Sequence, residues 1–155
     1  MIDEFRIQKV RVPVVILTVD DECVFGDVFV EAIAPPGRPR ETVLDVLNQD
    51  EPFLPVANAK GGTLLLARAQ IREVRPARGT TFDTGLQFGT PTSVSVRMAG
   101  GSRRHGGTMV IEQPTGRQRV QDSLNRLTDR FLLLQGEDGV VLLNRVHIVH
   151  VSLEG

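Results

Sequence analysis

The sequence contains very little of several residue types on which common binding and catalytic sites depend. Cys23 is the only cysteine, so neither an intrachain disulfide nor a zinc site built from cysteines can form. Its place beside a predicted turn indicates packing rather than chemistry. Tyr and Trp are absent and the aromatic residues are seven Phe, which disfavours carbohydrate platforms and surfaces that stack many bases.

No run of the sequence approaches the roughly 18 consecutive apolar residues of a membrane helix. The start, MIDEFRIQKV, lacks the charged and apolar regions of a secretory leader. These two absences predict a soluble, cytoplasmic protein with no membrane contact. The motifs of nucleophile elbows, P-loops, zinc proteases and dinucleotide-binding folds are absent as well, so we expect no enzyme activity and no cofactor.

Two histidines form the pattern H-x-x-H at His147 and His150. On a helix they would share a face and could bind zinc. The surrounding VVLLNRVHIVHV predicts a strand instead, on which positions three apart point to opposite faces. The sequence therefore predicts no metal site.

Charge is balanced overall but not along the chain. The formal net charge is −1, which argues against a protein that coats nucleic acid through bulk electrostatics. Residues 1–77 carry a negative balance and residues 78–155 a positive one. The second part of the chain is therefore the more basic.

The most informative feature is a stretch that occurs twice. Residues 11–75 contain VPVVILTVDDECVFGDVFV, TVLDVLN, FLPVA and GGTLLLARAQIREV, and residues 92–153 contain TSVSVRMAGGSRRHGGTMVI, VQDSLN, FLLLQ and DGVVLLNRVHIVHV. Such self-similarity indicates repeated structural units. The matched positions include Leu47 and Leu124, Asn48 and Asn125, Gly26 and Gly106, and Arg68 and Arg145.

Each unit predicts a mainly β structure with one short helix. Runs rich in Val, Ile and Leu between turns predict strands at 10–19, 23–30 and 53–57 in the first unit. The glycine inside the second strand indicates a bulge or sharp bend. Helical spacing of apolar residues predicts a helix at 40–48 and another around 120–127.

These elements predict two tandem, small, strongly bent β-barrels, each with a short inserted helix. We place the first barrel at 1–75, a Gly/Thr/Pro-rich linker at 76–91 and the second barrel at 92–155. Each unit is close to the lower size limit for an independent core. The two lobes are therefore expected to pack on each other or on a second chain.

Both units share one order of parts: apolar strand, polar turn, strand with a central glycine, apolar strand, glycine turn, and a closing strand that ends Ile-x-x-Val. The residues that carry this order are Ile16, Gly26, Phe53, Leu54, Gly62, Thr63, Ile71 and Val74, and then Val96, Gly106, Phe131, Leu132, Gly139, Val140, Ile148 and Val151. The order resembles the Sm/LSm-like small barrel of the SH3-like group. The sequence is also similar to uncharacterised bacterial repeat proteins.

The Sm-type RNA pocket uses an Asp-x-aromatic-x-Asn segment and an Arg-Gly-like turn. In this sequence a Pro/Gly loop with a helix replaces the segment, and ARAQ and NRVH stand at the turn. The resemblance therefore implies the fold, whereas nucleic-acid binding is possible but not favoured, because a fold alone does not supply a function.

The strongest cluster of positive charge consists of Arg103, Arg104 and His105 at a predicted hairpin tip, with Arg117 and Arg119 in the following loop. Arginine side chains suit phosphate and carboxylate groups. The same charges can also do no more than protect a solvated edge from aggregation. Both interpretations stay open.

The matching tip of the first unit is acidic, with Asp20 and Asp21 at its centre. Opposite charges at matched tips predict that the acidic tip of one chain meets the basic tip of another. The first strand is apolar on both faces, so we expect Val15, Leu17 and Val19 to pack against the other lobe or a second subunit.

Arg68 and Arg145 occupy the same position in both units, just before the closing strand. They could form a paired binding site, or each could bind a turn or carboxylate of its own lobe. The sequence as a whole predicts a non-catalytic module that binds a protein partner or itself as a homo-oligomer. The alternatives are a nucleic-acid-binding regulator that uses the basic tip and a sensor that binds a small molecule between the lobes.

Overall fold

The structure is a computed structural model that describes residues 8–34, 36–85, 87–100, 104–111 and 120–153. All strand pairs are antiparallel, and the fold is mainly β as predicted. The strands are β1 (Lys9–Thr18), β2 (Cys23–Glu31), β3 (Phe53–Ala57), β4 (Thr63–Ala67), β5 (Ile71–Pro76), β6 (Thr90–Met98), β7 (Arg104–Ile111), β8 (Phe131–Gly136), β9 (Gly139–Asn144) and β10 (Ile148–Leu153), and the helices are α1 (Val43–Leu47) and α2 (Val120–Arg126).

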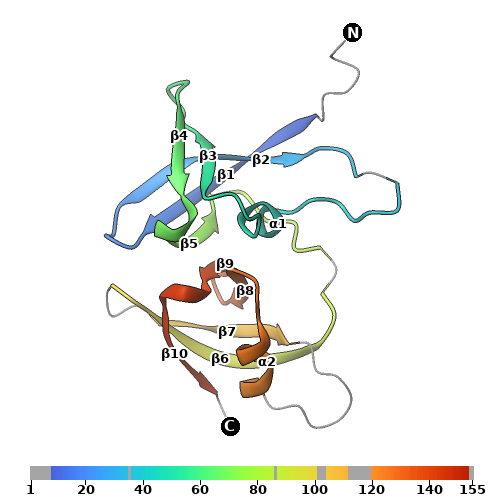
Figure 1. Ribbon diagram of the computed structural model, residues 1–155, viewed down its shortest axis with the longest axis vertical. Coiled ribbons are helices and arrows are strands. Elements are labelled where there is room, and N and C mark those ends of the chain that lie inside the picture. Colours follow the sequence, from blue (N-terminus) through green and yellow to red (C-terminus); the bar gives the residue numbers. More distant parts are fainter. Residues whose placement is uncertain (1–7, 35, 86, 101–103, 112–119, 154–155) are drawn as a thin grey trace.

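The strands form one ten-stranded sheet in the order β10-β6-β7-β8-β9-β5-β1-β2-β3-β4. The first half of the chain contributes β5-β1-β2-β3-β4, and the second half contributes the same order as β10-β6-β7-β8-β9. Figure 1 shows the two halves as separate lobes that meet where β5 lies beside β9. The sheet ends at β10 and β4, which do not pair with each other in the described part of the chain. Two closed barrels, the finer part of the prediction, are therefore not confirmed.

The halves meet through strand pairing and through a shared hydrophobic wall. In the register of β5 and β9, Glu73 lies opposite Leu143 and Val74 opposite Leu142. Phe131 and Leu142 of the second half belong to the apolar cluster of the first half. The intervening side chains of β8 and β9 belong to the cluster of their own half: Leu132, Leu134, Val141 and Leu143. The hairpin β8–β9 is therefore apolar on both faces because each face closes a different core.

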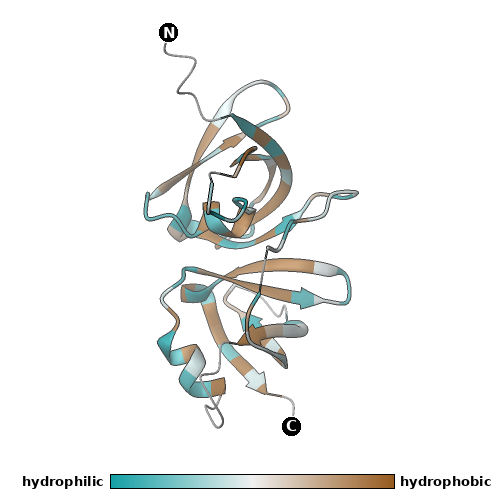
Figure 2. Ribbon diagram, turned by 90° about the vertical axis from the view of Figure 1, so that its right-hand side faces the viewer, coloured by the Kyte–Doolittle hydropathy of each residue, from teal (hydrophilic) through white to brown (hydrophobic). Residues whose placement is uncertain are grey.

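The bend in the second strand of each half depends on one glycine. A Cβ added to Gly26 would lie 2.7 Å from the carbonyl oxygen of Ala57, and a Cβ on Gly107 would lie 2.4 Å from that of Gln135. A Cβ on Gly106 would meet no atom within 4 Å. The structural counterpart of Gly26 is thus Gly107, and the predicted match with Gly106 is one residue off. The two strands curl round an interior, as the first half shows clearly in Figure 2.

Helix α1 is shorter than the predicted helix at 40–48. It begins after Thr42, whose hydroxyl accepts a hydrogen bond from the backbone N–H of Asp45, while the Asp45 carboxylate accepts from the N–H of Thr42. This capping box satisfies two N-terminal donors of a helix that would otherwise be too short to persist. None of the described helices is long and apolar enough to cross a membrane.

Substitution of Gly107 by Ala is expected to lower the free energy of unfolding by about 2 kcal/mol, because the new methyl group overlaps a backbone carbonyl that cannot move alone. Urea unfolding measures the change. The matched control is Gly106→Ala, which should lie within about 0.5 kcal/mol of the wild type. Equal effects at the two neighbouring glycines would contradict the assignment of the bend.

Candidate functional site

The junction between the halves contains a buried polar cluster beside the paired strands. His105 Nε2 of β7 lies 2.8 Å from Glu73 Oε2 of β5, and both side chains are buried. The Arg75 guanidinium lies 3.4 Å from the other oxygen of Glu73 and 3.3 Å from His105 Nδ1. This arrangement ties the last strand of the first half to the second half through a side-chain hydrogen bond as well as through backbone pairing. Partial satisfaction of such a cluster would be costly.

Arg72 extends the junction to the hairpin turns. It is the extra residue of a β-bulge, because Leu17 pairs with Glu73 and Thr18 with Ile71. Its buried guanidinium donates to the carbonyl oxygens of Ala99 and Gly100, each at 3.1 Å, and lies 2.8 Å from the Asp21 carboxylate.

Asparagine side chains complete the junction. The Asn48 amide, which follows α1, accepts from the N–H of Phe131 at 2.7 Å and donates to its carbonyl at 3.3 Å. In the opposite direction, Asn144 donates to the carbonyl of Ile71 at 2.8 Å. His147 Nε2 lies 2.7 Å from the carbonyl of Ala69. Side chains of both halves therefore hold backbone groups of the other half.

The outer strands β3 and β4 of the first half are the counterparts of β8 and β9, but their outward face is uncovered. Leu142 is 1% exposed in the junction, whereas its counterpart Leu65 is 64% exposed. Phe131 is 1% exposed, whereas its counterpart Phe53 is 54% exposed. The same apolar positions are thus buried where the halves meet and solvent-accessible at the β4 edge.

The opposite edge, β10, is the counterpart of β5 and is likewise uncovered. Ile71 and Val74 of β5 are fully buried, while the corresponding Ile148 and Val151 are only half-buried. Val149 and Leu153 are each 52% exposed. We call the β4 edge with Phe53, Leu64 and Leu65 the β4 surface, and the β10 edge with Val149 and Leu153 the β10 surface.

The predicted basic tip is only partly described. Arg103, Arg117 and Arg119 lie outside the described residues. Arg104 is exposed at the start of β7, whereas His105 is buried against Glu73. His105 therefore belongs to the junction and is not part of a solvated charge cluster, which corrects the prediction for this residue.

The predicted acidic tip binds within its own chain. Asp21, at φ 67°, pairs with Arg72, which also donates to the carbonyl of Gly100, so Asp21 lies near the end of β6 in the same molecule. Asp20 accepts a hydrogen bond from the Thr18 hydroxyl. Asp21 is therefore engaged at the internal junction, and pairing of tips between two chains stays a prediction.

The three apolar side chains of the first strand, Val15, Leu17 and Val19, are half-buried. Their cover by the other lobe or by a second subunit stays a prediction. The strands with two apolar faces that are both covered are β8 and β9.

Arg68 and Arg145 each contact their own half. The Arg68 guanidinium is 1% exposed and donates to the carbonyls of Val46 at 2.9 Å, Glu51 at 2.5 Å and Phe53 at 2.9 Å. Burial lowers the pKa of the Arg68 guanidinium from its ordinary value. Arg145 is exposed and donates through Nε to the carbonyl of Asp129 at 3.0 Å. Within the described residues, the Arg68 and Arg145 side chains make no hydrogen bond to each other.

The remaining candidates contribute little chemistry. His147 lies in a 3₁₀ turn (Arg145–His147) and His150 in β10, so the predicted single strand is interrupted between them. The described residues contain no group of three His, Cys, Asp or Glu side chains that could hold a metal ion. Cys23 is exposed, so its predicted packing role is wrong.

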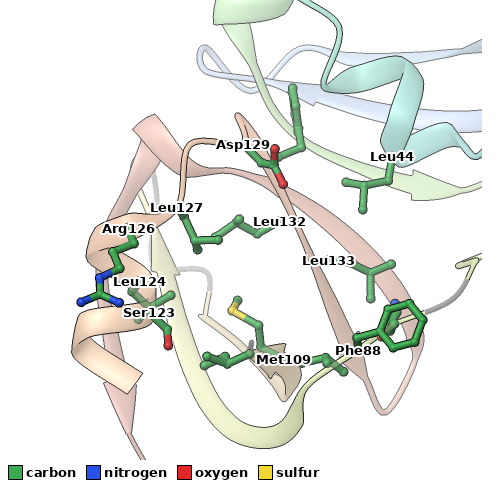
Figure 3. A pocket seen from close by; sticks show the side chains of 14 residues that line it. Leu44, Phe88, Met109, Ser123, Leu124, Arg126, Leu127, Asp129, Leu132 and Leu133 are labelled. Carbon is green, nitrogen blue, oxygen red and sulfur yellow. The ribbon is translucent and has the colours of Figure 1, made fainter. Parts of the chain in front are cut away.

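Two pockets lie near the junction. One, of about 410 Å³, is mainly apolar and is lined from α2, β7 and β8 by residues such as Met109, Leu124 and Leu132 (Figure 3). The other, of about 960 Å³, is polar and is lined by Arg75, Arg78 and Arg104 and also by Glu137 and Asp138. Arg75 comes from β5 of the first half, Arg78 from the segment that follows β5, and Arg104 from the second half, so this pocket lies between the halves.

No family model matches the chain, and no match was found among curated proteins or solved structures. The functional interpretation of the junction, the β4 surface and the β10 surface therefore depends on the contacts described above.

Substitution of Arg68 by Ala is expected to lower the free energy of unfolding by about 3 kcal/mol, because a buried side chain is removed and three backbone carbonyl groups, one of them in a buried bond, lose a charged donor. Denaturant unfolding provides the measurement. Arg145→Ala is the matched control in the second half and should change the stability by no more than about 0.5 kcal/mol. A paired site formed by both arginines would instead make the two substitutions similar.

The hydroxyl of Thr18 lowers the pKa of Asp20 below its ordinary value of 3.8. The ionised form is therefore favoured in the folded state, and the resulting stabilisation is present above the ordinary pKa and lost as the pH falls through the lowered one. In Thr18→Val, the Asp20 pKa should rise toward 3.8 in an NMR titration of the carboxyl carbon. The control Thr92→Val, in the other half, should leave the Asp20 titration unchanged. An unchanged titration in Thr18→Val would show that the Thr18 hydroxyl does not lower the Asp20 pKa.

Proposed function

We propose that the protein is a non-catalytic self-assembly module whose partner is a second copy of the same chain. In this assembly the β4 surface of one copy receives the β10 surface of another, as β9 receives β5 within the chain. The observation that carries the proposal is the contrast between Leu142 and Phe131, buried at the junction, and their exposed counterparts Leu65 and Phe53. The proposal includes a duplicated Sm/SH3-like unit as the building block.

The internal junction supplies a register for the contact between copies. Within the chain Glu73 pairs with Leu143 and Val74 with Leu142. By the correspondence of the two halves, His150 of one copy would pair with Leu66 of the other, and Val151 with Leu65. Backbone groups of the two edge strands would then complete the hydrogen-bonded ladder.

Edge strands of this kind favour association for a physical reason. An exposed edge with apolar side chains is a template for a further strand unless charge, proline or a bulge protects it. The sequence of β4, TLLLA, contains none of the charged or proline residues that would do so. Burial of its side chains contributes about 25 cal/mol per Å² of apolar area.

The proposed contact is heterologous, since one copy uses its β10 surface and the other its β4 surface. After the first contact each copy keeps one unused surface, a β4 surface on one copy and a β10 surface on the other, so further copies can add. Such contacts produce a closed ring if the rotation per copy closes and a filament if it does not.

A second candidate is the binding of an anionic molecule, which the polar pocket with Arg75, Arg78 and Arg104 favours. Arginine side chains suit phosphate groups, so this candidate covers both the predicted small-molecule sensor and the nucleic-acid regulator. If the ligand is a nucleic acid, the logarithm of the binding constant should fall linearly with the logarithm of the salt concentration. Self-assembly through apolar edges would not weaken with salt.

Mixing two blocked variants tests the self-assembly. Leu65→Lys blocks the β4 surface, and the double variant Val149→Lys with Leu153→Lys blocks the β10 surface, all at exposed side chains. In sedimentation analysis each variant alone should have the monomer mass of 17.0 kDa, and an equimolar mixture should give a dimer through the one intact pair of surfaces. A wild-type chain that stays monomeric at high concentration, or a mixture that stays monomeric, would refute the proposal.

Disulfide cross-linking of cysteine variants, in a Cys23→Ser background, checks the register of β10 of one copy against β4 of another. The pairs Leu65→Cys with Val151→Cys and Leu66→Cys with His150→Cys lie at adjacent positions of the ladder, one of which is a non-hydrogen-bonded pair with close side chains. At least one pair should form intermolecular disulfides. Thr63→Cys with Val151→Cys, two residues out of register, is the control and should not.

A further inference from the structure

We infer that Asn125, in the last turn of α2, selects and orients the second copy by holding the backbone of that copy's Phe53 through two hydrogen bonds. The inference rests on the proposed self-assembly and assigns to it a residue that determines specificity. It follows from the geometry of the internal junction, in which Asn48 holds Phe131.

The contact of Asn48 with Phe131 matches the two ends of one amide to the two polar groups of one residue. The Asn48 side-chain oxygen accepts the Phe131 N–H at 2.7 Å, and the side-chain nitrogen donates to the Phe131 carbonyl at 3.3 Å. The side-chain amide of Asn carries a donor and an acceptor on one planar group. Two hydrogen bonds to the same residue fix the position of the strand along its axis. Apolar contacts do not fix this position.

Both components of this contact are present a second time in the chain, and both are uncovered. Asn125 follows Leu124 as Asn48 follows Leu47, and it is exposed at the end of α2. It makes no side-chain hydrogen bond to any residue in the described part of the chain. Phe53, the counterpart of Phe131, begins β3 and is 54% exposed.

The two components cannot meet within one molecule. In the internal junction the asparagine belongs to the half that contributes β5, and the phenylalanine to the half that contributes β9. By the same relation, Asn125 belongs with β10 and Phe53 with β4, which lie at opposite ends of the sheet. A second copy whose β4 pairs with β10 brings its Phe53 to Asn125.

Two of the other polar contacts of the junction have no equivalent between copies. The counterpart of Glu73 is His150 and that of His105 is Val24, so the hydrogen bond between Glu73 and His105 cannot be repeated. The counterpart of Asn144 is Ala67, which cannot donate a side-chain hydrogen bond. The contact of Asn125, by contrast, keeps both its asparagine and its phenylalanine when the junction is repeated between copies.

The test measures the dissociation constant of wild-type and Asn125→Ala chains by sedimentation, together with thermal unfolding. Loss of two hydrogen bonds should weaken association by about tenfold or more. The unfolding temperature of the variant should stay unchanged at a concentration where both chains are monomeric. Gln121→Ala, an exposed change on the same helix, is the control and should associate like the wild type. Asn125→Asp keeps the acceptor but loses the donor and should also associate more weakly.

Hydrogen exchange locates the effect. The Phe53 amide should be protected in assembled wild type and lose that protection in Asn125→Ala at a concentration where both variants are assembled. If the wild type assembles and Asn125→Ala associates with equal affinity and equal protection of Phe53, the inference is wrong and the proposed assembly stands. If the wild type does not assemble at all, both fail.

Discussion

The pairing of β5 with β9 is the contact on which the rest of the structure depends. It converts two five-stranded halves into one sheet and places Phe131 and Leu142 of the second half in the core of the first. It also brings Glu73 next to His105, which gives the buried carboxylate a hydrogen-bonding partner from the other half. Without this pairing the covered face of β8 and β9 would be as exposed as that of β3 and β4.

Local features of the fold could be predicted from the sequence. The strand at 53–57 begins and ends where predicted, and both helices lie where apolar spacing indicates them. Two covered faces were expected for the first strand, whereas in the structure β8 and β9 have them. The runs FLLL at 131–134 and VVLL at 140–143 are also apolar on both faces. A strand that is apolar on both faces indicates that other elements pack on both of them. Which elements pack on β8 and β9 cannot be predicted, because the residues that do so are distant in sequence.

The polar junction could not be predicted, since its partners are far apart along the chain. Arg68 and Arg72 look alike in the sequence, yet Arg68 holds carbonyls of its own half and Arg72 those of the other. The bend at Gly107 rather than Gly106 depends on the approach of Gln135, which periodicity does not encode. The repeated Leu-Asn pair was the one signal for the junction, because Asn48 is the residue that holds Phe131.

The hairpin β8–β9 has a consequence for how the chain loses its structure. Since one face of this hairpin completes the first core and the other face the second, neither half can melt while the other keeps its full set of contacts. The chain should therefore unfold as a single cooperative unit with one calorimetric transition, in which the van't Hoff and calorimetric enthalpies agree. Two lobes that are distinct in outline would then be one body in thermodynamic terms.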